Sequence, residues 1–250
     1  MTMNYLRTAV LFFSLLGFSQ LVSADGHGSE MPTPMPVEFW NCQFNEGKSS
    51  EDLQPVIKDW KKAMGKQEYT AWVMTPTFVA ENMAGGVGFT GWWPNWTEMG
   101  KMLQHTAEKV DPKMDPKWAE VITCDAHMSA TGITTRASSE ELSKNAIMTY
   151  SQCTFKSGKT PEDLLRANTG MNKFLDSIGI NNVASGILFP GVGAPDGFDF
   201  ANTFWVPNIT AMGELAQKFV SNGGNQVQQK LFGEVAVCNN GSQFSGTQIY

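Results

Sequence analysis

The side chains most suited to chemistry in this sequence converge on the end of one predicted strand. His127 can act as an acid, a base or a metal ligand near neutral pH, and Asp125 precedes it by two residues. Strand alternation directs both side chains to one face, where Asn41, Gln43 and Gln152 could orient a substrate. The sequence therefore predicts a ligand-binding pocket lined by these residues, with His127 as the catalytic candidate. The alternative is a structural histidine, hydrogen-bonded at the end of its strand.

A second candidate site depends on where a leader is removed. Cleavage after Ala24 would start the mature chain with Asp25, Gly26 and His27. A free amine, two backbone amides and an imidazole at the third position form a square-planar nitrogen set, which suits Cu(II) or Ni(II). The alternative is a flexible remnant of the leader, because a start one residue earlier or later abolishes the metal site.

Three glycine motifs are better explained by turns and strands than by phosphate binding. Gly47-Lys48-Ser49 and Gly158-Lys159-Thr160 are similar to the end of a phosphate-binding loop, but cysteines 42 and 153 stand where its first glycine should be. Residues 86–91 match G-x-G-x-x-G, yet they fall on a predicted hairpin and strand instead of preceding a helix. We interpret the first two as turns followed by helix caps, and we reject a dinucleotide site in the third.

Residues 1–24 have the composition of a secretory signal peptide. Arg7 supplies a positive charge, an apolar run extends from Ala9 to Val22, and Val22-Ser23-Ala24 is a small-residue cleavage signal. No later apolar run reaches the roughly 18 residues that a membrane span needs. We therefore expect an exported protein, periplasmic or secreted, in which residues 25–36 form a flexible lead-in. The net charge of -6 and the lack of a basic cluster argue against a nucleic-acid partner.

The remainder of the chain contains one stretch twice. Residues 42–53 and 153–164 are identical at seven of twelve positions, and residues 94–100 match 207–213 at five of seven. A fixed internal period indicates two structural repeats. The expected segments are repeat 1 at residues 37–128, a linker at 129–146 and repeat 2 at 147–250.

Each copy is predicted to have the element order strand-helix-strand-strand-helix-strand. Ser49 and Asp52 form a helix start signal, and Asn95 and Asn208, which also begin glycosylation sequons, are interpreted as helix caps. In the first copy the elements are expected at 37–44, 51–66, 69–79, 87–93, 95–110 and 119–128, with a loop at 113–117. In the second copy they are expected at 147–155, 161–178, 183–189, 199–206, 210–221 and 233–239, with a loose tail from residue 240.

This order is that of a ferredoxin-like unit, in which the first and fourth strands are antiparallel neighbours. The four cysteines allow three pairings, and their spacing alone does not choose between them. The neighbouring strands place Cys42 beside Cys124, and Cys153 beside Cys238, within bridging distance. Export favours oxidised thiols, so we expect one disulfide in each copy.

Strand alternation also predicts two unlike faces for each sheet. One face, which carries Trp40, Cys42 and Phe44, is apolar and should meet the helices. The other face is half polar and needs a cover, which the sheet of the second copy can supply. The counterpart of His127 in the second copy is Gly241, so a site built on this histidine would occur once. His105 is interpreted as a surface residue.

Two ferredoxin-like βαββαβ units packed sheet to sheet resemble the dimeric α+β barrel superfamily in its fused, two-copy form. The resemblance rests on element order and repeat number over nearly all of the mature chain. The superfamily includes monooxygenases, haem-handling enzymes and proteins without known activity, so the resemblance implies a site in the barrel interior and no specific chemistry.

We therefore expect a protein of the α+β class that binds a small molecule inside its barrel. One alternative is an oxidoreductase-type enzyme that uses the same pocket, with His127 as acid or base. Another is a cell-envelope interaction module without a small-molecule site. The sequence identifies neither a cofactor nor an oligomeric state.

Overall fold

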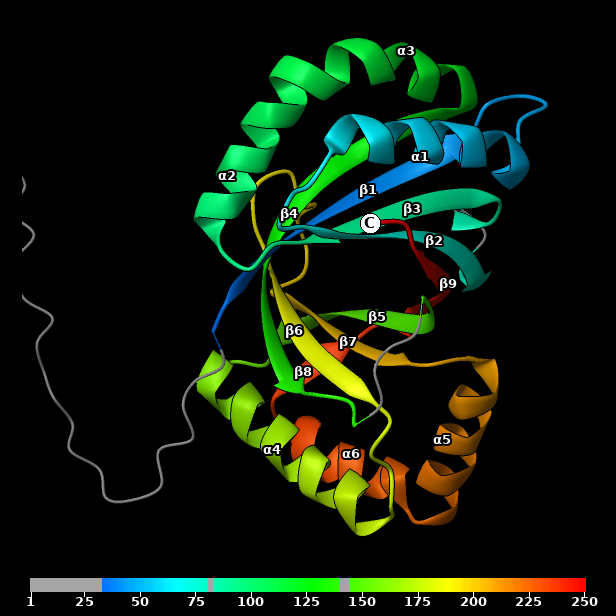
Figure 1. Cartoon of the computed structure of the whole chain (residues 1–250). Coiled ribbons are helices and arrows are strands. Elements are labelled where there is room, and N and C mark those ends of the chain that lie inside the picture. The colour runs from blue at the N-terminus through cyan, green and yellow to red at the C-terminus, as the bar shows by residue number, and fades with distance from the viewer. Residues whose placement is uncertain (1–32, 81–82, 140–143) are drawn as a thin grey trace, which may run out of the picture. The chain divides into compact units, whose positions relative to one another are not determined.

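The computed structural model describes residues 33–80, 83–139 and 144–250. Within them both halves contain the predicted succession of strand, helix, two strands, helix and strand, to which the structure adds η2, α3, α6 and β9 (Figure 1). The first half comprises β1 (Met35–Phe44), α1 (Ser50–Met64), β2 (Thr70–Phe78), β3 (Gly86–Trp92), α2 (Trp96–His105), the π-helical turn η2 (Thr106–Val110), α3 (Asp111–Val121) and β4 (Ile122–Arg136). The second half comprises β5 (Asn145–Phe155), α4 (Pro161–Ser177), β6 (Ala184–Pro190), β7 (Phe200–Val206), α5 (Ile209–Ser221), α6 (Gly224–Phe232), β8 (Ala236–Cys238) and β9 (Ser242–Gln248).

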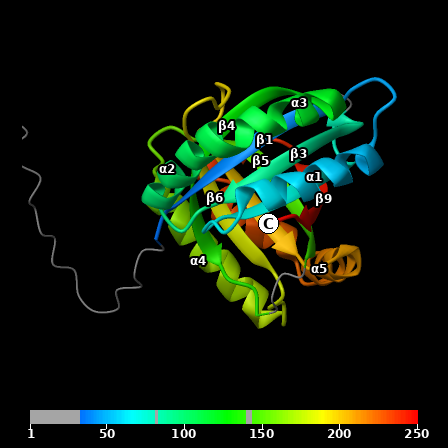
Figure 2. The ribbon, with the colours of Figure 1, turned by 45° about the horizontal axis from the view of Figure 1, so that its top comes forward.

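The two sheets join into one barrel. In the described residues the strand order is β7-β6-β4-β1-β3-β2-β9-β5, and β5 also pairs with β7, so the ring of antiparallel strands is closed. The short strand β8 lies beside the end of β5. Helices α1, α2 and α3 cover the outer face of the first half, and α4, α5 and α6 cover that of the second (Figures 1 and 2). This is the dimeric α+β barrel fold expected from the repeats.

Local signals place the helix starts as predicted. The hydroxyls of Ser49 and Thr160 form capping boxes with the aspartates three residues later, at the starts of α1 and α4. Gly47, at a φ of 73°, makes the turn before the first of these boxes. The side chains of Asn95 and Asn208 cap α2 and α5. The motifs that resembled phosphate loops are thus turns followed by caps.

The G-x-G-x-x-G motif lies within β3, where two of its glycines leave space for side chains. A Cβ atom at Gly88 would lie 3.0 Å from Cε of Met74. A Cβ atom at Gly91 would overlap the ring and hydroxyl of Tyr69. The spacing therefore reflects close packing on β3 instead of a nucleotide site.

The helical segments differ from prediction in two places. Helix α3 occupies the expected loop at 113–117, because Pro112 falls in the first turn, where its missing N–H is not needed, and Met114 is buried. Helix α6 was not predicted, since its sequence GNQVQQKLF begins with glycine and is mostly polar.

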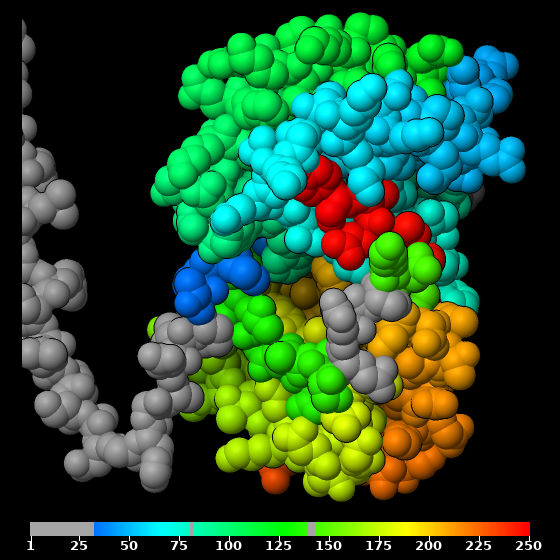
Figure 3. Space-filling model, viewed as in Figure 1, coloured from blue at the N-terminus to red at the C-terminus, as the bar shows by residue number. Residues whose placement is uncertain are grey.

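Strands form beyond the predicted ones in two places. β4 continues from residue 128 to Arg136, into the expected linker, because its second part pairs with β6 of the other half. The tail expected to be loose after residue 240 forms β9, which pairs with β2 and β5. In Figure 3 this C-terminal segment, coloured red, packs against cyan residues of the first half. These two extensions close the barrel, and their pairing partners lie far away in the sequence.

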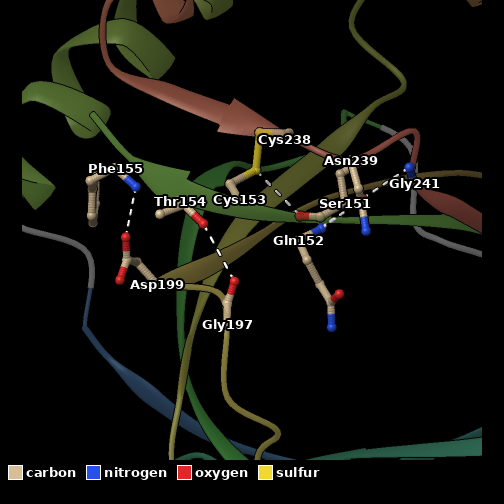
Figure 4. The surroundings of a disulfide bond; sticks show 10 residues. All are labelled: Ser151, Gln152, Cys153, Thr154, Phe155, Gly197, Asp199, Cys238, Asn239 and Gly241. Carbon is tan, nitrogen blue, oxygen red and sulfur yellow. Dashed lines mark hydrogen bonds between the residues drawn. A yellow bond between two sulfur atoms is a disulfide. The ribbon is translucent and has the colours of Figure 1, made fainter. Parts of the chain in front are cut away.

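Both predicted disulfides are confirmed, Cys42–Cys124 and Cys153–Cys238. Each joins the first and fourth strands of its own half on the helix-facing side, where Cys42 and Cys153 are buried. Figure 4 shows the surroundings of the second bridge.

We expect Gly91→Ala to lower the free energy of unfolding by about 1–3 kcal/mol, because the new methyl group must displace Tyr69. Gly100→Ala is the matched control: it lies in α2 with open space around a Cβ atom, and should raise stability by roughly 0.5–1 kcal/mol. Urea unfolding of both variants tests this account, and equal effects at the two positions would contradict it.

Candidate functional site

The interior of the barrel is filled at its centre and hollow towards its two ends. Aromatic side chains from both halves meet in the middle: the ring centroids of Phe39 and Tyr150 are 5.6 Å apart, as are those of Trp92 and Trp205. In the described residues, one cavity adjoins the end of β1 and is lined partly by Asn41. We call it the Asn41 cavity. A smaller one at the opposite end, which we call the Trp92 cavity, adjoins the start of β1.

The Asn41 cavity has a volume of about 620 Å³. Its apolar wall is made of rings and thioethers contributed by both halves: Phe39, Met74, Met83, Met128, Tyr150, Phe198 and Phe244. Its polar groups are side-chain amides and hydroxyls: Asn41, Ser129, Gln152, Asn239 and Ser242. Among the lining residues that the structure describes, none has a charged side chain. The cavity therefore suits an uncharged molecule.

The structure places two of the five predicted pocket residues, Asn41 and Gln152, in the wall of this cavity. Gln43 lies at its edge, where a Cβ atom on Gly86 would come within 2.9 Å of Nε2 of Gln43. Asp125 is exposed, and its Oδ1 accepts a hydrogen bond of 2.8 Å from Nδ2 of Asn41. Asp125 thus holds the amide of Asn41 in place from outside the cavity.

His127 does not face the barrel interior, and its predicted orientation is wrong. β4 carries one more residue than β1 between Cys124 and Ala126, so Asn41 pairs with Ala126 while Cys42 pairs with Cys124. This β-bulge at Asp125 reverses the alternation of the residues that follow it in β4, up to a second register shift between Thr134 and Arg136. His127 consequently pairs with Trp40 on the helix-facing side of the sheet.

The second half also has one extra residue just after the cysteine of its fourth strand, Cys238. Cys153 pairs with Cys238 and Tyr150 pairs with Ser242. Between these two pairs, the three residues 239–241 face only the two residues 151 and 152 of β5. Figure 4 shows how Oδ1 of Asn239 fills this irregularity, accepting hydrogen bonds from the backbone N–H groups of Gln152 and Gly241. Gly241 has a φ of 67°, the backbone conformation that favours glycine at a bulge. This glycine, which corresponds to His127, was the sequence signal that could have revealed the bulge.

On the helix side, His127 belongs to a cluster around a buried carboxylate. Glu38 is only 5% exposed, and its Oε1 accepts a hydrogen bond of 2.6 Å from the hydroxyl of Tyr69. Nε2 of His127 lies 2.9 Å from Oε2 of Glu38, and its ring stacks on Trp40 at a centroid distance of 3.5 Å. Two partners thus offset the cost of burying the charge of Glu38. The geometry favours the structural alternative for His127.

His105, the other histidine among the described residues, is not one of the residues that line the Asn41 cavity. His105 was interpreted as a surface residue, but it is half-buried, and its Nε2 is buried without a partner among the described residues. It lies where α2 passes into the π-helical turn η2. The proposed metal ligands Asp25, Gly26 and His27 lie outside the described residues. Within the described residues, no group of three or more histidine, cysteine or acidic side chains could hold a metal ion.

Comparisons with known proteins identify the fold without a family. No family model matches the chain, and no curated protein matches its sequence. Among solved structures, the chain is similar to a putative monooxygenase from Lactobacillus acidophilus NCFM, with a TM-score of 0.54, 10% identity, and coverage of 87% of this chain and 95% of the other. It is also similar to an R173K mutant of chlorite dismutase from Candidatus Nitrospira defluvii, with a TM-score of 0.54, 8% identity, and coverage of 88% and 93%. At such identities the likeness extends to the fold alone.

Two buried tyrosines, Tyr69 on the helix side of the sheet and Tyr150 in the barrel interior, make alkaline stability a test of the packing. Burial and the charge of Glu38 raise the pKa of Tyr69 well above its ordinary value, and burial also raises that of Tyr150. Both stay protonated in the fold above pH 10, where tyrosines of the unfolded chain ionise. Their stabilising contribution is therefore complete below about pH 10 and is lost as the pH rises further.

We expect the free energy of unfolding to fall above pH 10 by up to about 1.4 kcal/mol per pH unit for each of these tyrosines. Tyr69→Phe and Tyr150→Phe should each make the decline less steep, as measured by urea unfolding between pH 8 and 11. An unchanged slope in both variants would show that these hydroxyls are not held protonated by the fold.

Proposed function

We propose that this protein is exported and binds a small, uncharged and largely apolar molecule in the Asn41 cavity. The observation that supports this most directly is a volume of about 620 Å³ at a barrel mouth, with apolar walls and a few amides. Ligand sites in proteins typically combine such an apolar enclosure with a small number of polar groups that orient the ligand.

The wall combines rigid and adaptable surfaces. Phe39 and Tyr150 contact each other edge to face and form a fixed floor, while Met74, Met83 and Met128 have flexible thioether chains that adapt to irregular ligands. In the described structure no hydrogen bond engages the side-chain amide of Gln152, although its backbone is held by Asn239 (Figure 4). This amide is thus available to a ligand.

Three exposed apolar side chains lie one or two residues along the chain from residues that line this cavity. Phe78 ends β2, Val237 lies in β8 opposite Thr154, and Val192 follows β6, where its carbonyl accepts a hydrogen bond from the N–H of Ser129. These three side chains are 70%, 62% and 86% exposed, respectively. Exposed apolar side chains near the cavity favour an apolar ligand, because burial of apolar surface away from water is favourable.

A second candidate is an oxidoreductase-type enzyme that uses the same cavity. The names of the similar structures, a monooxygenase and a chlorite dismutase, favour this class. His127 cannot be the acid or base of such a reaction inside the cavity, because the bulge turns it to the opposite side of the sheet. The absorbance spectrum of protein from its native source distinguishes the candidates, since a haem or flavin band would support the enzyme.

The third expectation, an interaction module without a small-molecule site, has less support. The large apolar side chains exposed on the described helices, Trp96, Ile209 and Val220, are single positions on α2 and α5. Single exposed side chains of this kind are common on protein surfaces and do not indicate an interface.

Export is supported by the leader sequence and by the two disulfides, which persist in oxidising compartments. No helix among the described residues is long and apolar enough to cross a membrane. We propose a mature chain that begins at Asp25 and binds Cu(II) or Ni(II) through Asp25, Gly26 and His27.

Mass spectrometry of the exported protein should give the mass of a chain starting at Asp25. Cu(II) added to this chain should produce the visible absorbance band of a square-planar nitrogen complex, and His27→Ala should abolish it. A different N-terminus, or a band that survives His27→Ala, would rule out the metal site.

The ligand proposal is tested with the neutral apolar dye N-phenyl-1-naphthylamine, whose fluorescence rises in apolar sites. Ala126→Phe places a ring in the wall of the Asn41 cavity, and Ala201→Phe does so from β7. Each should weaken dye binding by roughly tenfold or more, equivalent to about 1.4 kcal/mol.

Ala216→Phe, on the exposed surface of α5, is the matched control and should bind as the wild type does. Circular dichroism confirms that each variant is folded, and the second cavity variant serves if the first is not. Undiminished binding in folded variants of both cavity positions would contradict the proposal.

A further inference from the structure

The Trp92 cavity, at the other end of the barrel, has the features of a separate binding site. Its volume is about 330 Å³. Its walls combine the indole rings of Trp72, Trp92 and Trp205 with small and hydroxylated side chains, among them Ala184, Ser185 and Thr203. None of these described lining residues is charged.

The three tryptophans form an ordered wall. Trp205 contacts Trp72 and Trp92 edge to face, with ring centroids 5.6 Å apart in each pair. Trp72 and Trp205 are 4% and 9% exposed, so this wall is held within the core. Such an arrangement presents ring faces and edges to a flat aromatic guest, for which edge-to-face and offset contacts are favourable.

The two halves differ in whether the indole N–H group of the equivalent tryptophan has a hydrogen-bond acceptor. In the second half, Nε1 of Trp205 donates a hydrogen bond of 2.9 Å to the hydroxyl of Thr203. The counterparts in the first half are Trp92 and Thr90, two residues apart on β3. Nε1 of Trp92 and Oγ1 of Thr90 are both buried without a hydrogen-bond partner in the described chain.

This asymmetry indicates what a ligand would supply. A buried donor without an acceptor costs about 1–3 kcal/mol. Nε1 of Trp92 has almost no accessible surface, so a guest recovers this free energy only when the indole ring turns toward the cavity and donates to an acceptor on the guest. We propose that the Trp92 cavity is a second ligand site, which takes an uncharged, planar aromatic molecule bearing a carbonyl or comparable acceptor. The indole N–H of Trp92 donates to that acceptor, while Trp72 and Trp205 contact the ring.

The site is distinct from the Asn41 cavity, because the lining residues of the two cavities do not overlap. Phe39 and Tyr150 line the Asn41 cavity, whereas the three tryptophans line the Trp92 cavity. The two proposals can therefore fail independently.

The test compares coumarin, which carries a carbonyl acceptor, with naphthalene, which has similar fused rings and none. The proton–nitrogen NMR spectrum of the protein resolves its tryptophan indole N–H groups, eight in the full sequence, each assigned by a Trp→Phe substitution. Coumarin should move the Trp92 indole proton downfield in a saturable manner, as a new hydrogen bond requires. Naphthalene should not, and the exposed Trp96 on α2 should respond to neither.

Three variants test where coumarin binds and which group donates to it. Ala184→Phe fills the Trp92 cavity and should weaken coumarin binding by roughly tenfold or more. Ala126→Phe, in the other cavity, should leave it unchanged. Trp92→Phe keeps the ring wall and removes the donor, so it should abolish the preference for coumarin over naphthalene.

Three results would overturn the proposal. One is a Trp92 proton that does not move at the solubility limit of coumarin. Another is an equal downfield shift with naphthalene. The third is coumarin binding that Ala126→Phe weakens and Ala184→Phe does not, which would assign coumarin to the Asn41 cavity instead.

Discussion

The structure depends on two strand pairings that cross between the halves, β4 with β6 and β2 with β9. An open four-stranded sheet in either half would leave an unpaired edge and a half-apolar face exposed to water. The crossed pairings remove the edges, and the closed ring encloses both inner faces. Both proposed ligand sites depend on this closure, because the walls of the two cavities come from strands of both halves.

A single extra residue after each fourth-strand cysteine then decides which side chains face that interior. Before the bulge, Cys124 lies on the helix side and forms the disulfide with Cys42. After the bulge the alternation is reversed, so Ala126 and Met128 face the cavity and His127 does not. The small Ala126 helps to leave the space in which we propose a ligand, whereas His127 contacts Glu38 on the helix-facing side of the sheet.

The approximate two-fold symmetry of the repeats is broken where chemistry is possible. Phe39 corresponds to Tyr150, and Asn41 to Gln152, so the Asn41 cavity has unlike groups on its two sides. Trp205 has a hydrogen-bond acceptor within its own half and Trp92 does not. A symmetric barrel would bind a ligand in two equivalent orientations, and these differences favour one of them.

The sequence alone determined the architecture, because its signals are local or repeated. The internal repeat, the alternation of apolar residues and the capping motifs specify the start of most elements within a few residues, although they miss α3, α6 and β9. The disulfide pairing followed from the element order, since the first and fourth strands of each unit must be neighbours. Two of the five predicted pocket residues, Asn41 and Gln152, lie on β1 and β5 in the cavity wall.

The tertiary structure decided the length of β4, the existence of β9, the orientation of His127 and the position of the cavities. β4 and β9 persist as strands because partners more than fifty residues away in sequence satisfy their backbone groups, as between Gly132 and Leu188 or between Val73 and Thr247. The bulge at Asp125 inverts a periodicity that a strand pattern treats as continuous. Cavities are what remains after side chains from both halves have packed, so no stretch of sequence specifies them before the halves meet.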